Sequence, residues 1–201
     1  MSVEVLSAGP LLTVQDAGRK GLRRYGVSTA GPMDGPAMAL ANALCGNGPE
    51  TAVLEFAGTG GRFSASRPVR FAVTGGECDI RIGERRLAAG ETHRLLPGEI
   101  LSVGALGGAV WGYLAVSGGI AVAPVLGSRA THLRSGLGGL DGRTLRTGDL
   151  LPLGEDGGAD RCLRPSAPPA LHGAGWAEEP IRIVPGPQDD YFDAAILCRL
   201  T

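Results

Sequence analysis

The amino-acid sequence predicts a mainly β fold with few helices, in which many short strands are joined by tight turns. Glycine occupies 34 of the 201 positions and proline 14. This glycine share, roughly 17% against a usual value near 7%, favours frequent turns over a helical bundle. Between the turns lie short runs that alternate in polarity or are rich in β-branched residues, as strands require. These runs predict strands at residues 3–6, 11–14, 51–56, 69–74, 78–82, 100–103 and 110–116.

The run 78–82 predicts a strand that is buried on one face only. Its apolar residues occupy alternate positions, and Asp79 and Arg81 lie between them. Because side chains on a strand point to opposite faces in turn, the charged pair should face water.

One helix is predicted in the first part of the chain, between Asp34 and Gly46. The Asp34 carboxylate can accept hydrogen bonds from the free amides of the first turn, and Pro36 suits that turn because its missing N–H is not needed there. Residues 37–44 favour a helix. Gly46 then ends it, because glycine readily adopts the left-handed conformation of a helix end.

A change of composition predicts two domains. The stretch rich in Gly, Pro and Ala after Leu153 is typical of a linker. The predicted parts are a domain at 1–153, a linker at 154–180 and the beginning of a second domain at 181–201. In this last part, residues 181–184 predict a strand, and residues 191–200 predict a helix capped by Asp189 or Asp190. One strand and one helix cannot close a core by themselves.

Charge and composition exclude several classes of function. Nineteen basic residues against twenty acidic ones give a formal charge of −1, which provides no basic surface for nucleic acid or an anionic membrane. The sequence has no signal peptide and no apolar run of about 18 residues, so we expect a cytoplasmic protein. Lys20 is the only lysine and lacks the Met-Lys-Met setting of a biotin carrier. We therefore expect no covalently bound cofactor.

The sequence lacks the common catalytic motifs. It has no G-x-x-x-x-G-K-[ST] loop for a nucleotide. Residues 58–63 and 136–141 approach a dinucleotide fingerprint but lack its third glycine and the helix that follows, so we interpret both as turns. Ser28 and Ser117 each lie in a motif one residue short of a nucleophile elbow, with no helix directly after the serine. The cysteines and histidines are widely spaced, and we expect no metal site.

Polar residues in glycine-rich loops remain as candidates for ligand binding. Glycine lets a backbone approach a ligand closely, and arginine beside serine or threonine can hold a carboxylate or carbonyl oxygen. We select Asp16, Arg19, Asn42 and Arg129 as substrate-binding residues, with Arg129 for an oxygen anion, and assign no catalytic residue. In the alternative, structural interpretation, Asp16 and Arg19 pair across a turn, Asp34 only caps its helix, and Arg129 braces loops.

Several motifs in a fixed order resemble those of a known family. The motifs are V-Q-D-A-G-R at 14–19, G-P-M-D at 31–34, A-N-x-L-x-G-N at 41–47, A-V-L-E at 52–55, V-S-G-G-I at 116–120, L-G-S-R-A-T at 126–131 and G-G-L-x-G-R at 138–143. This order is similar to the N-terminal part of the family of 5-oxoprolinase C subunits, also called allophanate hydrolase subunit 2. The similarity covers nearly the whole chain.

The resemblance implies a cyclophilin-like, β-rich architecture with two related barrel-like domains. The family's C-terminal motifs are absent from this sequence. Our expectation is therefore a truncated or frame-shifted form that keeps the first domain, followed by the beginning of a second, similar domain.

The resemblance also implies a function. We expect one component of a bacterial, ATP-dependent 5-oxoprolinase, which opens 5-oxoproline to glutamate together with the A subunit and the kinase-inhibitor-like B subunit, and which is inactive as a single chain. One alternative is the carboxyltransferase component of a biotin-dependent urea or amide carboxylase, with carboxybiotin on another chain. The other is a non-enzymatic, regulatory partner of the kinase-inhibitor-type protein.

Overall fold

The computed structural model describes residues 1–158, 161–164, 184 and 186–197. The chain divides into two compact units, Met1–Leu171 and His172–Thr201. Of the predicted linker at 154–180, the structure describes residues 154–158 and 161–164, which belong to the first unit. The other linker positions lie outside the described residues. The predicted boundaries at 153 and 180 stay predictions.

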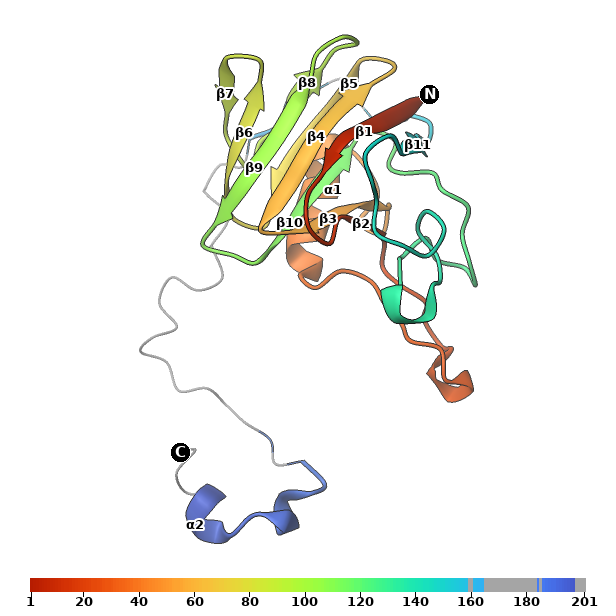
Figure 1. Ribbon diagram of the computed structural model, residues 1–201, viewed down its shortest axis with the longest axis vertical. Helices are drawn as coiled ribbons and strands as arrows, with labels where there is room; N and C mark the ends of the chain where they lie inside the picture. Colours follow the sequence, from red (N-terminus) through yellow and green to blue (C-terminus); the bar gives the residue numbers. More distant parts are fainter. Residues whose placement is uncertain (159–160, 165–183, 185, 198–201) are drawn as a thin grey trace. The chain divides into compact units, whose positions relative to one another are not determined.

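Two antiparallel sheets build the first unit (Figure 1). The six-stranded sheet has the order β11 (Leu150–Pro152), β1 (Ser2–Ala8), β4 (Thr59–Ala65), β9 (Leu101–Gly107), β6 (Glu77–Ile82) and β7 (Arg85–Leu87). The five-stranded sheet has the order β2 (Thr13–Gln15), β3 (Val53–Ala57), β10 (Trp111–Val116), β5 (Val69–Thr74) and β8 (His93–Leu95). Both sheets contribute buried side chains to one apolar cluster, among them Val5, Phe63, Val103, Phe56, Phe71 and Leu114. The predicted mainly β fold is confirmed.

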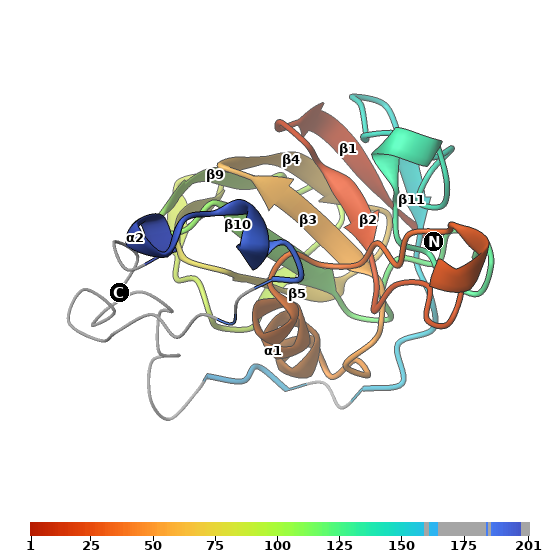
Figure 2. The same cartoon turned by 90° about the horizontal axis from the view of Figure 1, so that it is seen from below.

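Helix α1 (Gly35–Cys45) confirms the helix predicted from the sequence. Oδ1 of Asp34 accepts a hydrogen bond from the Ala37 amide at 2.9 Å, and Gly46 ends the helix in the left-handed conformation with φ 73°. The helix lies on the outer face of the five-stranded sheet (Figure 2). Its buried face packs on a second apolar cluster that includes Ala72, Tyr113 and Ala115. Every residue of β5 is therefore buried, because core covers one face and α1 the other.

The interpretation of residues 58–63 as a turn is wrong, because β4 spans Thr59–Ala65. Its glycines are explained by close packing. A β-carbon at Gly60 would lie 2.6 Å from the Val103 side chain, and one at Gly61 would meet the Ser7 carbonyl. Glycine is thus required for sheet packing there, whereas residues 136–141 do form turns. The other strands that the sequence did not predict, β7, β8 and β11, have three residues each.

The described part of the second unit contains a 3-10 turn at Asp189–Tyr191 and helix α2 at Ala194–Leu197. The predicted helix from Tyr191, capped by Asp189 or Asp190, is therefore wrong at its beginning. Asp193 directly precedes α2, at a position that favours aspartate. Residues 181–183 and 198–200 of the predicted strand and helix lie outside the described residues. In the described part of the chain, no helix is long and apolar enough to cross a membrane.

We predict that Gly60→Ala lowers the free energy of unfolding by about 1–3 kcal/mol, because the added methyl group would overlap Val103 in a packed sheet. Urea unfolding of both chains measures the difference. Thr59→Ala, at an exposed neighbouring position, is the matched control and should change stability by no more than about 0.5 kcal/mol. Equal stability of the Gly60→Ala chain and the unmodified chain would show that β4 and β9 separate easily.

Candidate functional site

The buried carboxylate of Asp16 connects β2 to a loop far along the chain. Asp16 directly follows β2 and is 8% exposed. Its Oδ1 accepts hydrogen bonds from the Ser128 hydroxyl at 2.5 Å and from the Gly18 amide at 2.9 Å. Its Oδ2 accepts one from the Arg129 amide at 2.5 Å. Bonds of this kind to an ionised acceptor are short and strong, so Asp16 fixes the position of the loop.

Arg19 holds the same loop through its guanidinium group. The residue is 1% exposed; Nε donates to the Val125 carbonyl at 3.1 Å and Nη2 to the Ala130 carbonyl at 2.6 Å. Gly138 packs against this group, since a β-carbon there would collide with Nη2. The buried Nη1 has no hydrogen-bond partner among the described residues. Arg19 thus braces the loop and also carries one unpaired, charged donor.

Arg129 is half-buried and belongs to this network. Its backbone amide donates to Asp16, and its Nε donates to the Val122 carbonyl at 2.8 Å. No ion pair joins Asp16 to Arg19, so the interpretation that they pair across a turn is wrong. Each binds the segment 125–130 separately.

Asn42 lies in a different network. It is fully buried in α1; its Nδ2 donates to the Thr51 carbonyl at 2.8 Å, and its Oδ1 accepts from Nδ2 of Asn47 at 3.1 Å. Asn47 in turn binds the Val116 carbonyl and the Gly118 amide. The structure therefore brings together three of the four selected residues, and Asn42 ties the end of α1 to the sheet.

Gln15 belongs to the loop network, although the sequence analysis did not select it. Its Nε2 donates to the Thr131 carbonyl and to the Thr13 hydroxyl, both at 3.1 Å. The residue is 5% exposed, and its Oε1 has no hydrogen-bond partner among the described residues. Gln15 therefore adds a buried, unpaired acceptor to the unpaired donor of Arg19. Its position in the V-Q-D-A-G-R motif was the only signal in the sequence.

Glu55 forms a second buried polar cluster that the sequence analysis missed. This residue of β3 is 4% exposed, and its Oε2 accepts hydrogen bonds from the Tyr113 hydroxyl and the Met33 amide, both at 2.8 Å. The Tyr113 hydroxyl also accepts from the Asp34 amide at 2.6 Å. Burial raises the pKa of Glu55, although both hydrogen bonds act in the opposite direction. The cluster fixes the loop before α1, and an acid inside the apolar run 52–56 was its signal.

Comparison with known proteins places this chain in a family. Residues 25–201 match the carboxyltransferase domain family, subdomain A and B. The chain is 36% identical over 195 residues to the 5-oxoprolinase C subunit of Escherichia coli K12, and the match covers 96% of this chain and 60% of that protein. It is 32% identical to the 5-oxoprolinase C subunit of Haemophilus influenzae over 77% of this chain and 50% of that protein. It thus spans 50–60% of the length of these relatives.

A solved structure shows the same fold at similar identity. The urea carboxylase of Kluyveromyces lactis matches with a TM-score of 0.74 and 37% sequence identity, over 76% of this chain and 14% of that one. At 37% identity, the similarity to this structure is one of sequence as well as of fold.

We predict that Asp16→Ala lowers the free energy of unfolding by about 1.5–3 kcal/mol, because the Ser128 hydroxyl and the Arg129 amide would lose a charged, buried acceptor. Urea unfolding measures this loss, and hydrogen exchange of the Arg129 amide should become faster. Glu84→Ala, at an exposed turn, is the control and should leave both unchanged. Unchanged exchange at Arg129 would contradict the role assigned to Asp16.

We also predict that Glu55→Gln stabilises the chain increasingly as the pH rises above the usual pKa of glutamate. Because the pKa of Glu55 is raised by folding, the folded state holds its proton to higher pH than the unfolded state, and stability falls as that proton is lost. The measurement is the difference in unfolding free energy between the variant and the unmodified chain from acid to neutral pH. A difference that is constant or shrinks with pH would contradict the raised pKa.

Proposed function

We propose, since this chain belongs to the family of carboxyltransferase domains, subdomain A and B, that it is one component of an ATP-dependent 5-oxoprolinase, which converts 5-oxoproline to glutamate. The observation that carries this proposal is the 36% identity to the Escherichia coli C subunit over 96% of the chain. A match of this extent reaches the loop network around Asp16 and Arg19.

The reaction determines what such a component must do. Ring opening breaks the lactam C–N bond, adds the oxygen of water to the carbonyl carbon and leaves the nitrogen as an amine. Amide bonds are stable, so ATP drives the step: its terminal phosphoryl group is transferred to the lactam oxygen, which releases ADP and activates the ring, and it leaves as inorganic phosphate when water has added and the ring has opened. The sequence has no nucleotide loop, and we assign the use of ATP to another chain of the complex. This chain then contributes to binding and orienting the lactam.

The loop network of residues 15–19 and 125–131 supports this role. Buried charged donors recognise the oxygen atoms of carboxylates and carbonyls strongly, because they do not compete with water there. Nη1 of Arg19 is such a donor, and Oε1 of Gln15 is an acceptor that a lactam N–H would suit. We assign the oxygen anion to Arg129, whose terminal nitrogens form no hydrogen bond with a described residue. Asn42 keeps its structural role in this proposal.

Partner proteins complete the proposed enzyme. The relatives are described as subunits of 5-oxoprolinase, and this chain spans 60% of the length of the first of them. We assign the A subunit and the kinase-inhibitor-like B subunit as partners. We expect no turnover by the isolated chain. We assign the complex to the cytoplasm. No covalent cofactor is assigned, because Lys20 is the only lysine and lacks the Met-Lys-Met setting of a biotin carrier.

The second candidate is a biotin-dependent carboxyltransferase that acts on urea or a similar amide. The similarity to the Kluyveromyces lactis urea carboxylase, with a TM-score of 0.74, favours it. In that case carboxybiotin would be carried by another chain, and the same loop donors would bind the amide oxygen.

The decisive experiment measures glutamate released from 5-oxoproline and ATP by the chain mixed with the A and B subunits. We expect turnover only when all three are present, and about a tenfold lower kcat/KM for Arg129→Gln, because one charge-assisted hydrogen bond to substrate is lost. Arg134→Gln, on the exposed 3-10 turn Leu133–Ser135, is the matched control and should retain full activity.

Other outcomes separate the alternatives. Glutamate release without this chain would contradict the proposal. Carboxylation of urea in the presence of a carboxybiotin donor, without glutamate release, would favour the carboxyltransferase. Stable binding to the kinase-inhibitor-like B subunit with neither reaction would indicate a regulatory role.

A further inference from the structure

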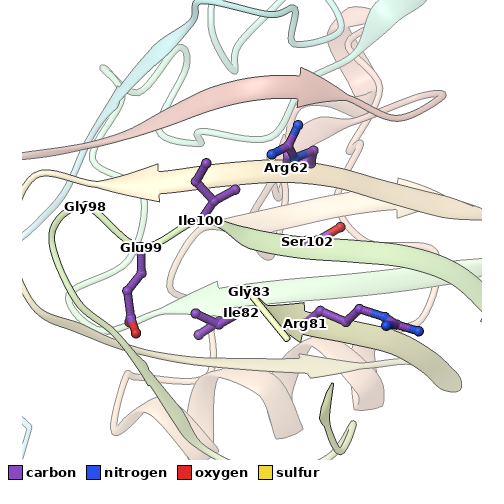
Figure 3. A pocket seen from close by; sticks show the side chains of 8 residues that line it. All are labelled: Arg62, Arg81, Ile82, Gly83, Gly98, Glu99, Ile100 and Ser102. Atoms are coloured by element: carbon purple, nitrogen blue, oxygen red, sulfur yellow. The ribbon is translucent and has the colours of Figure 1, made fainter. Parts of the chain in front are cut away.

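An open groove lies on the solvent side of the six-stranded sheet, where β4, β6 and β9 are neighbours (Figure 3). It has a volume of about 550 Å³. Two arginines and a serine lie at one end, and the exposed Ile100 lies beside them, whereas Ile82 is 4% exposed and belongs to the apolar core. The lining residues are Arg62, Arg81, Ile82, Gly83, Gly98, Glu99, Ile100 and Ser102.

Strand register places the polar end of the groove in a straight row. Ser102 of β9 is directly opposite Arg62 of β4 and, on its other side, directly opposite Arg81 of β6. Opposite residues in antiparallel strands share a face, with β-carbons about 4.5–5.5 Å apart. Ser102 therefore lies between Arg62 and Arg81 on one face of the sheet.

The row carries positive charge that the described residues do not balance. Asp79 accepts from Nε of Arg81 at 3.1 Å and from Nε of Arg86 at 3.3 Å, so one carboxylate serves two arginines. Arg81 and Arg86 are themselves opposite each other on β6 and β7. Arg62 forms no ion pair with any residue that the structure describes.

The acid that lines the groove does not change this balance. Oε1 of Glu99 binds Nη2 of Arg85 at 2.8 Å, and its Oε2 accepts from the Leu96 amide at 2.8 Å. Both oxygens of this carboxylate are thus already used by neighbours outside the row, and the row itself remains complementary to an incoming anion.

The spacing along the groove matches an extended polypeptide. Ile100 directly precedes β9, is 38% exposed and lines the same groove as Ser102, and two residues of extended chain span about 6.6–6.8 Å. An extended chain places every second side chain at this same interval. Pockets for small ligands enclose about 70–90% of the ligand surface, which an open groove on a sheet face does not.

We propose that this groove binds an extended, acidic segment of a partner polypeptide. A glutamate or aspartate carboxylate of that segment accepts hydrogen bonds from Arg62, Ser102 and Arg81, and an apolar side chain two positions along the segment rests on Ile100. The proposal does not depend on the reaction that the chain takes part in.

Fluorescence anisotropy with a labelled peptide that alternates glutamate and valine tests the proposal. We expect binding by the unmodified chain that weakens as salt is added, and about a tenfold higher Kd for the double variant Arg62→Gln, Arg81→Gln. The matched control, Arg24→Gln with Arg134→Gln, removes two exposed arginines from other parts of the chain and should bind as the unmodified chain does. Circular dichroism checks that both variants fold.

Three outcomes would overturn the proposal. The first is equal affinity for a peptide with glutamine in place of glutamate, and the second is equal affinity of the Arg62→Gln, Arg81→Gln variant. The third is displacement of the labelled peptide by glutarate at the same concentration that the unlabelled peptide requires. That result would assign the groove to a small carboxylate instead.

Discussion

Buried polar side chains and scattered backbone hydrogen bonds, such as that from the Thr131 amide to the Val14 carbonyl, attach the long segment between β10 and β11 to the two sheets without a strand ladder. Residues 117–149 form turns, isolated bridges and one 3-10 turn. Their backbone groups still need partners wherever they are buried. Asp16, Arg19 and Gln15, all near the end of β2, supply these partners through the hydrogen bonds to residues 125–131. The arrangement of the loop at residues 125–131 depends on this attachment.

The same attachment limits which atoms of Asp16 and Arg19 are left to bind a ligand. Asp16 uses both carboxylate oxygens for the loop, so it positions the site and has little capacity left for a ligand. Arg19 divides its guanidinium between two carbonyls and an unpaired nitrogen. A charged group held rigidly in this way has lost its rotamer freedom during folding. Binding a substrate oxygen would then require little further ordering.

The outer faces of the two sheets differ in what covers them. The outer face of the five-stranded sheet is covered by α1 and by the loop that Glu55 and Tyr113 hold. The outer face of the six-stranded sheet carries charged side chains at alternate positions, as on β6. A ligand of the loop network would contact residues near the end of β2, whereas a partner on the arginine row would contact β4, β9 and β6.

Local sequence patterns determined the mainly β class, the bounds of α1 and the wet face of residues 78–82, because alternation, caps and turn residues act within a few positions of each other. The family motifs likewise identified the loop segments that meet around Asp16. Only the tertiary structure decided which of them meet: Asp16 binds Ser128, 112 residues away, whereas Asn42 belongs to another network. It also decided that Gly60 and Gly61 lie in a strand, because the groups that exclude a side chain there, Val103 and Ser7, come from neighbouring strands. Such contacts depend on strand register, which no short stretch of sequence contains.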